Sequence, residues 1–180
     1  EILQLAQYKE EGALKRLVVM GCMVNRYRQE LMEGIPEIDH VLGTSDVNAL
    51  SSLFPPTEDV VIPADRVLTT PKHYAYLRIA DGCDNKCTYC VIPSIRGKYK
   101  SVPLDVVVSE AKELVAAGAK ELILVAQDTT MYGTDLDDTN LVTLLDALHE
   151  LDVEWIRILY AYPERITDEI IEAMAKLPKV

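Results

Sequence analysis

The chain has 180 residues, of which 49% are hydrophobic and 26% charged, with a formal net charge of −11. This is the composition of a globular protein, long enough for one large hydrophobic core or two small ones. No apolar run approaches the roughly eighteen residues that a membrane-spanning helix needs, and the opening residues lack the pattern of a secretory signal. We therefore predict a cytoplasmic protein without a membrane partner. The acidic charge favours a basic partner and makes direct binding of nucleic acid unlikely.

Residues 1–53 alternate between helical and extended patterns, which is typical of a small parallel α/β layer. Asn25 and Asp46 are suited to cap the two later helices, and Gly12 to end the first. The expected elements are a helix at 2–11, a strand at 17–20, a helix at 25–33, a strand at 40–43 and a short helix ending near 53. We interpret these residues as the C-terminal part of an N-terminal domain.

Residues 54–73 contain four prolines and are interpreted as a domain linker, because proline prevents regular helix and favours extended chain. Residues 74–180 then read as three β/α units. Their expected elements are strands at 74–80, 121–126 and 155–159, a helix at 105–117 that buries Val107, Ala111, Leu114 and Val115, and helices capped by Asn140 and Thr167. Gly118 fits the position after the first of these helices. Since three units make half a core, and Glu1 is not an initiator methionine, we expect the chain to be part of a longer protein.

Cys83, Cys87 and Cys90 fall within eight residues, in the pattern C-x-x-x-C-x-x-C. This spacing lets one loop direct three thiolates at one point, which would leave one iron of a four-iron cluster without a protein ligand. A structural zinc site and three separate buried thiols are the alternatives. Structural zinc prefers four ligands, and His73, ten residues upstream, is expected at the opposite end of the preceding strand. The pattern therefore favours an iron–sulfur cluster.

The stretch Arg78-Ile-Ala-Asp-Gly-Cys83-Asp-Asn-Lys-Cys87-Thr-Tyr-Cys90-Val-Ile-Pro-Ser-Ile-Arg-Gly97 resembles the methylthiotransferase branch of the radical S-adenosylmethionine (SAM) enzymes. Two further motifs, Gln127-Asp-Thr-Thr-Met-Tyr-Gly133 and Tyr160-Ala-Tyr-Pro163, resemble the type that modifies an aspartate of small-subunit ribosomal protein twelve. The resemblance implies that residues 74–180 are the first half of a TIM-like radical SAM barrel, preceded by a partial α/β N-terminal domain.

The resemblance also implies the cofactors and their ligands. Cys83, Cys87 and Cys90 would hold a 4Fe-4S cluster whose open iron binds SAM, and SAM would supply a 5′-deoxyadenosyl radical that abstracts hydrogen from the aspartate β-carbon. Cys22 would be one of three ligands of an auxiliary 4Fe-4S cluster, the other two lying upstream of Glu1. Tyr89, Gln127 and Asp128 are candidate SAM-binding residues. Polar loop residues and a packing tyrosine are the plainer interpretations of these three positions.

The implied partners are a basic small-subunit ribosomal protein as substrate and an electron donor such as flavodoxin or ferredoxin. Asp135, Asp137 and Asp138 form an acidic loop that is either merely solvated or attracts this basic substrate. A tRNA adenosine methylthiotransferase is one alternative function, although Asp128 stands where that type usually carries Asn. An iron–sulfur electron-transfer or binding module is another, although such a carrier normally saturates its cluster with four ligands.

Overall fold

The structure is a computed structural model that describes residues 1–44, 46–54 and 67–180. The chain divides into two compact units, of which unit 1 comprises Glu1–Ala64 with Lys86–Gly97 and unit 2 comprises Asp65–Asn85 with Lys98–Val180. Much of the predicted linker, residues 55–66, lies outside the described residues. In the part of the chain that is described, no helix is both long enough and apolar enough to cross a membrane.

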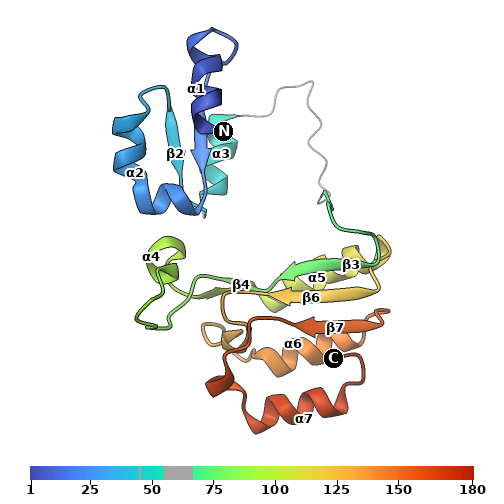
Figure 1. Ribbon diagram of the computed structural model, residues 1–180. Helices are drawn as coiled ribbons and strands as arrows, with labels where there is room; N and C mark the ends of the chain where they lie inside the picture. The colour runs from blue at the N-terminus through green and yellow to red at the C-terminus, as the bar shows by residue number, and fades with distance from the viewer. Residues whose placement is uncertain (45, 55–66) are drawn as a thin grey trace. The chain divides into compact units, whose positions relative to one another are not determined.

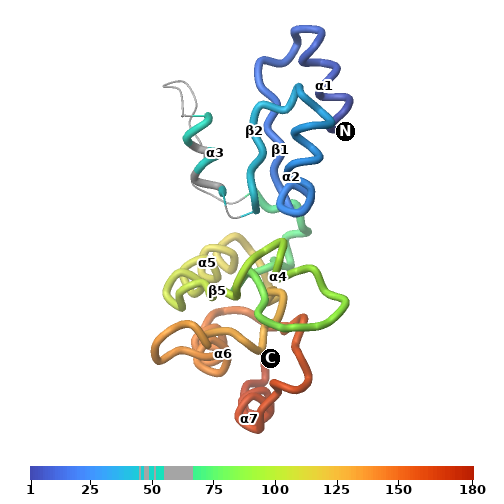
Figure 2. The backbone as a smooth tube through the Cα atoms, turned by 90° about the vertical axis from the view of Figure 1, so that its left-hand side faces the viewer, coloured from blue at the N-terminus to red at the C-terminus, as the bar shows by residue number. Residues whose placement is uncertain are grey.

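Unit 1 is a small α/β layer built on two parallel strands, β1 (Val18–Met20) and β2 (His40–Leu42). Its helices are α1 (Ile2–Glu10), α2 (Cys22–Gly34), α3 (Val47–Leu53) and α4 (Ile92–Arg96). Helix α2 packs against both strands and against α4, and Figure 2 shows α1 and α2 beside the strands. The buried core of this unit consists of Ala6, Leu17, Val19, Val24, Ile38 and Val41. The predicted parallel α/β layer is therefore confirmed.

Two predicted helix caps in unit 1 are wrong. Helix α2 begins at Cys22 behind Gly21, whose φ of +135° is a conformation that only glycine adopts readily, so Asn25 lies inside the helix. The Asn25 amide instead donates to the Ile95 carbonyl. Asp46 does precede α3, but its carboxylate accepts from the Gly43 N–H at 2.7 Å and not from a helix N–H. Asn25 is thus used by a distant carbonyl, whereas Asp46 is used by the turn that precedes α3.

Unit 2 is organised on three parallel strands in the order β3 (Tyr74–Arg78), β6 (Glu121–Val125) and β7 (Trp155–Ile158). Their connections contain α5 (Leu104–Ala116) and α6 (Leu141–His149), and α7 (Asp168–Lys176) follows β7. Helix α5 packs on α6, and α6 on α7, as the lower half of Figure 1 shows. The three predicted β/α units are confirmed, and the sheet they form is not closed into a barrel within the described residues.

The helix ends of unit 2 are specified locally. Gly118, with φ of +106°, follows α5, and the N–H groups of Gly118 and Ala119 donate to the carbonyls of Val115 and Leu114, which is a Schellman motif. Asn140 and Thr143 form a reciprocal capping box at α6. The Thr167 hydroxyl accepts from the Ile170 N–H at α7. These predicted caps are therefore confirmed.

The core of unit 2 lies between the sheet and its helices. Helix α6 buries Leu141, Leu144, Leu145 and Leu148, and each contributes roughly 1.5–3 kcal/mol relative to an exposed position. Val107, Ala111 and Leu114 of α5 are buried as predicted, whereas Val115 is only half-buried at the edge of the core.

The first strand of unit 2 is shorter than predicted. After β3 ends at Arg78, the Ile79 N–H still donates to the Val125 carbonyl of β6, but the Ile79 carbonyl accepts from Val102. The chain has then left the parallel sheet, and β4 (Ala80–Asp81) pairs antiparallel with β5 (Lys100–Ser101). The residues between β4 and β5, 82–99, contain Cys83, Cys87 and Cys90 and are called the cysteine segment. This segment therefore does not leave the parallel sheet directly.

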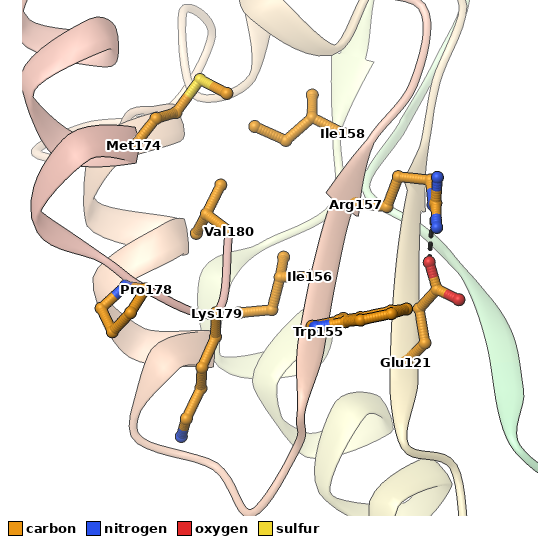
Figure 3. A pocket seen from close by; sticks show the side chains of 9 residues that line it. All are labelled: Glu121, Trp155, Ile156, Arg157, Ile158, Met174, Pro178, Lys179 and Val180. Carbon is orange, nitrogen blue, oxygen red and sulfur yellow. Dashed lines mark hydrogen bonds and ion pairs between the residues drawn. The ribbon is translucent and has the colours of Figure 1, made fainter.

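The edge of β7 that faces away from β6 borders a hollow that is separate from the predicted site residues (Figure 3). Ile156, Ile158, Met174 and Val180 line it, and the Lys179 carbonyl accepts from the Ile156 N–H at 2.6 Å. On the same strand, Arg157 pairs with Glu121 at 2.6 Å.

Candidate active site

The parallel sheet of unit 2 brings three connecting segments to its carboxyl edge. The segment after β3 contains Cys83. The segment after β6 contains Gln127 and Asp128, and the segment after β7 contains a short 3₁₀ helix, η2 (Pro163–Arg165). Carboxyl ends of parallel strands are where α/β folds assemble their binding and catalytic groups. This edge is therefore the candidate active site.

All four cysteines of the chain are free thiols. Cys83 is 6% exposed, and Cys87 and Cys90 are half-buried and joined by a turn in which the Cys90 N–H donates to the Cys87 carbonyl at 3.0 Å. Cys83 belongs to unit 2, whereas Cys87 and Cys90 belong to unit 1. Among the described residues, no three His, Cys, Asp or Glu side chains are arranged as a preformed metal site.

The first half of the cysteine segment is anchored in unit 2. Gly82, buried and with φ of +75°, provides the bend before Cys83. The Asp84 carboxylate accepts from the Tyr99 N–H at 3.1 Å, and the Asn85 amide donates to Asp128 at 3.0 Å. The two residues that follow Cys83 are therefore hydrogen-bonded to the rest of unit 2 before any cofactor is considered.

Asp128 is the most enclosed ionisable residue of the site, at 1% exposed. It caps η1 (Thr129–Met131), where its Oδ1 accepts from the Thr130 N–H at 3.1 Å and also from the Thr130 hydroxyl. Its Oδ2 accepts from Asn85 and, at 2.9 Å, from the Arg165 guanidinium. Sequence reasoning missed Asn85 and Arg165 as partners, because no local pattern connects positions so far apart in the chain.

Gln127 presents a different arrangement from its neighbour. Its side-chain carbonyl oxygen is buried and accepts no hydrogen bond from the described part of the chain. A buried acceptor without a donor costs free energy, so an ammonium or hydroxyl group of a bound molecule would satisfy it. Together with three free thiols in one segment, this acceptor fits a cluster with a bound amino-acid-like ligand.

The remaining predicted residues are less enclosed. Tyr89 is 91% exposed, so its ring makes little contact with the rest of the chain. Cys22 is the first residue of α2 and is half-buried.

The predicted acidic loop is divided between two roles. Asp135 accepts twice from the Ser101 N–H, at 2.9 and 3.2 Å. Burial acts to raise the pKa of Asp135, but the hydrogen bonds from Ser101 outweigh it and hold the pKa below its usual value. Asp135, Asp137 and Asp138 are all exposed, so all three carry the predicted surface charge. Asp135 has a second role, because it also anchors the loop to β5.

Comparison with known proteins agrees with the motifs. A family model described as the radical SAM superfamily matches residues 77–180. The chain is 48% identical over 194 residues to ribosomal protein uS12 methylthiotransferase RimO of Clostridium novyi, and 50% identical over 194 residues to the protein of the same name from Clostridium tetani. The protein of that name from Myxococcus xanthus is 46% identical over 191 residues. Each comparison covers 99% of this chain but only 44%, 44% and 40%, respectively, of the relative.

Because the matched residues make up more than half of the chain, the chain belongs to the radical SAM superfamily. Membership of this family implies SAM and a 4Fe-4S cluster as cofactors. The chain spans less than half the length of the curated relatives that it matches.

Proposed function

We propose that this chain is the radical-generating part of a methylthiotransferase that modifies the β-carbon of an aspartate in ribosomal protein uS12. The observation that carries the proposal is the 48–50% identity, across 99% of the chain, to proteins named ribosomal protein uS12 methylthiotransferase RimO. The acidic net charge of −11 is consistent with a basic ribosomal protein as substrate.

In this proposal Cys83, Cys87 and Cys90 hold the 4Fe-4S cluster through their thiolates. When bound, SAM and this cluster supply a carbon-centred radical that can abstract hydrogen from an unactivated C–H bond. The chain's own residues bind, orient and exclude water, since the cofactor carries the difficult chemistry. Gln127 offers its buried carbonyl oxygen to a donor on SAM, and the exposed Tyr89 ring is available to pack against the adenine.

Cys22 is proposed as one ligand of an auxiliary 4Fe-4S cluster that handles the inserted sulfur. It is a free thiol at the first residue of α2 and is half-buried. The other ligands would come from residues outside this chain, and the electron would come from a donor such as flavodoxin or ferredoxin.

Anaerobic reconstitution with iron and sulfide tests the radical site. We expect a cluster whose electron paramagnetic resonance signal shifts when SAM is added, and whose iron is lost in a variant with Cys83, Cys87 and Cys90 replaced by alanine. The Cys22→Ala variant is the matched control and should keep this cluster. A reconstituted protein that binds only zinc would refute the proposal. A cluster whose electron paramagnetic resonance signal does not shift when SAM is added would favour an electron-transfer module.

The substrate is tested with the intact protein, the reconstituted clusters and uS12. Mass spectrometry should find a methylthio group on an aspartate of uS12. Modification of tRNA adenosine instead would replace the proposed substrate while leaving the radical chemistry in place.

A further inference from the structure

The Asp128 carboxylate is shared by donors from three segments of unit 2. Thr130 comes from η1, Asn85 from the cysteine segment and Arg165 from η2. The two contacts to Oδ2 connect residues that are 43 and 37 positions away in the sequence. The Asp128 side chain is only 2% exposed, so water has little access to compete for these contacts.

These donors fill the hydrogen-bonding capacity of the Asp128 carboxylate. An ionised carboxylate accepts about four hydrogen bonds, and Asp128 accepts two at each oxygen. A ligand amine could reach Asp128 only by displacing one of them. The neighbouring Gln127 oxygen is buried and lacks a donor within the described residues, so it is the better acceptor for a ligand. Asp128 is thus committed to contacts within the protein.

Arg165 supplies the positive charge that a buried carboxylate requires. Its guanidinium lies 2.9 Å from Asp128 Oδ2 and 5.2 Å from the centre of the Tyr162 ring, in cation–π contact. The Arg165 side chain is 38% exposed, so it spans from the surface to the buried acid. The segment after β7 is thereby joined to the end of β6, and through the same oxygen to Asn85.

We infer that Arg165 is a positioning residue for the cysteine segment. It holds the Asp128 carboxylate, which in turn holds the Asn85 side chain. Asn85 lies two residues from both Cys83 and Cys87, so fixing its side chain restricts the backbone that carries these thiols. In this arrangement Arg165 orients Asp128, and Asp128 holds the segment in place before the cofactor binds. The inference deepens the proposed function and rests on it only for the identity of the cluster.

Limited proteolysis of the iron-free protein tests this inference without any measurement of activity. Lys86 is exposed and immediately follows Asn85, so trypsin cleavage after Lys86 reports on the freedom of the segment. We expect Arg165→Gln to accelerate this cleavage about tenfold. Arg157→Gln is the matched control, because it removes an arginine of the same unit from another ion pair, with Glu121, and should leave the cleavage rate unchanged.

Alkylation of Cys83 by iodoacetamide gives a second measurement on a proposed ligand itself. Cys83 is 6% exposed, so its reaction requires local opening. We expect alkylation to accelerate in Arg165→Gln and in Asn85→Ala, which removes the segment's contact but leaves the Asp128–Arg165 pair. Arg165→Lys keeps the charge and should lie between the wild type and Arg165→Gln.

The outcomes separate this inference from the proposed function. Unchanged rates at both Lys86 and Cys83 in Arg165→Gln and Asn85→Ala would overturn the inference while leaving the cluster chemistry intact. Acceleration of cleavage at every tryptic site of unit 2 would show a general loss of stability and would also overturn it. If Arg165→Gln does not fold, the rates of cleavage after Lys86 and of alkylation of Cys83 in Asn85→Ala test the inference instead. Failure of the cysteines to bind iron would refute the proposed function without changing either rate.

Discussion

Replacement of Gly133 by alanine places a methyl group where backbone later in the same loop, between η1 and α6, already lies. A Cβ atom at position 133 would be 2.2 Å from the Thr139 carbonyl oxygen and 2.7 Å from the Asn140 Cα. Both contacts are with backbone, which cannot rotate away as a flexible side chain can. Gly133 also has φ of +84°, a conformation that L-residues adopt at a cost of about 1–2 kcal/mol.

The expected loss of stability follows from these contacts. Relief of the overlap must move residues 139–140 or Gly133 itself. The first movement disturbs the Asn140 cap of α6, worth about 1 kcal/mol. The second disturbs the buried hydrogen bond from the Gly133 N–H to the Ser101 hydroxyl, worth about 1–3 kcal/mol if the groups are left unpaired. With the cost of the positive φ, we expect Gly133→Ala to reduce the free energy of unfolding by about 2–5 kcal/mol.

Gly118→Ala is the matched control. Gly118 also has a positive φ, +106°, but a Cβ atom there would meet nothing within 4 Å. It should therefore show only the conformational cost of about 1–2 kcal/mol. Urea denaturation of both variants can be followed by circular dichroism and by the fluorescence of Trp155, the chain's single tryptophan, which lies in β7 of the same unit. If Gly133→Ala loses no more unfolding free energy than Gly118→Ala, residues 133 and 139 do not approach each other this closely.

Three further predictions concern unit 2. Burial, with the nearby Asp105 and Asp135 carboxylates, raises the pKa of Tyr132 from 10.0 to about 12. The neutral phenol is favoured in the folded state, so this contribution to stability is present below about pH 10 and is lost as the pH rises towards 12. Tyr132→Phe should therefore give a shallower fall in stability over that range, measured by urea denaturation at each pH; an unchanged slope would contradict it. Asn140→Ala removes a capping box and should cost about 1 kcal/mol, whereas a substitution without effect would show that α6 starts elsewhere. Reversing the charges of Asp137 and Asp138 to lysine should weaken capture of the proposed substrate, uS12, and reduce the salt dependence of that binding, while binding unchanged by the reversal would exclude these residues from its recognition.

The sequence by itself determined the features that depend on neighbouring residues. Asn140 and Thr143 cap α6 because an N-cap and its third following residue meet within one turn. Gly118 ends α5 for an equally local reason, since only glycine adopts the positive φ of a Schellman motif without cost. The spacing of Cys83, Cys87 and Cys90 likewise indicated their shared chemistry without tertiary information.

Tertiary structure decided the features that depend on distant residues. The strand predicted to reach residue 80 ends at Arg78, because Ile79 pairs with both Val125 and Val102 and the chain turns between them. The role of Asp128 was decided in the same way. An Asp after a strand is equally suited to cap a turn, bind a ligand or form an ion pair, and its local sequence does not distinguish them. Arg165 and Asn85 are brought to one oxygen of Asp128 by the parallel arrangement of three strands, and these contacts support the positioning role that we propose.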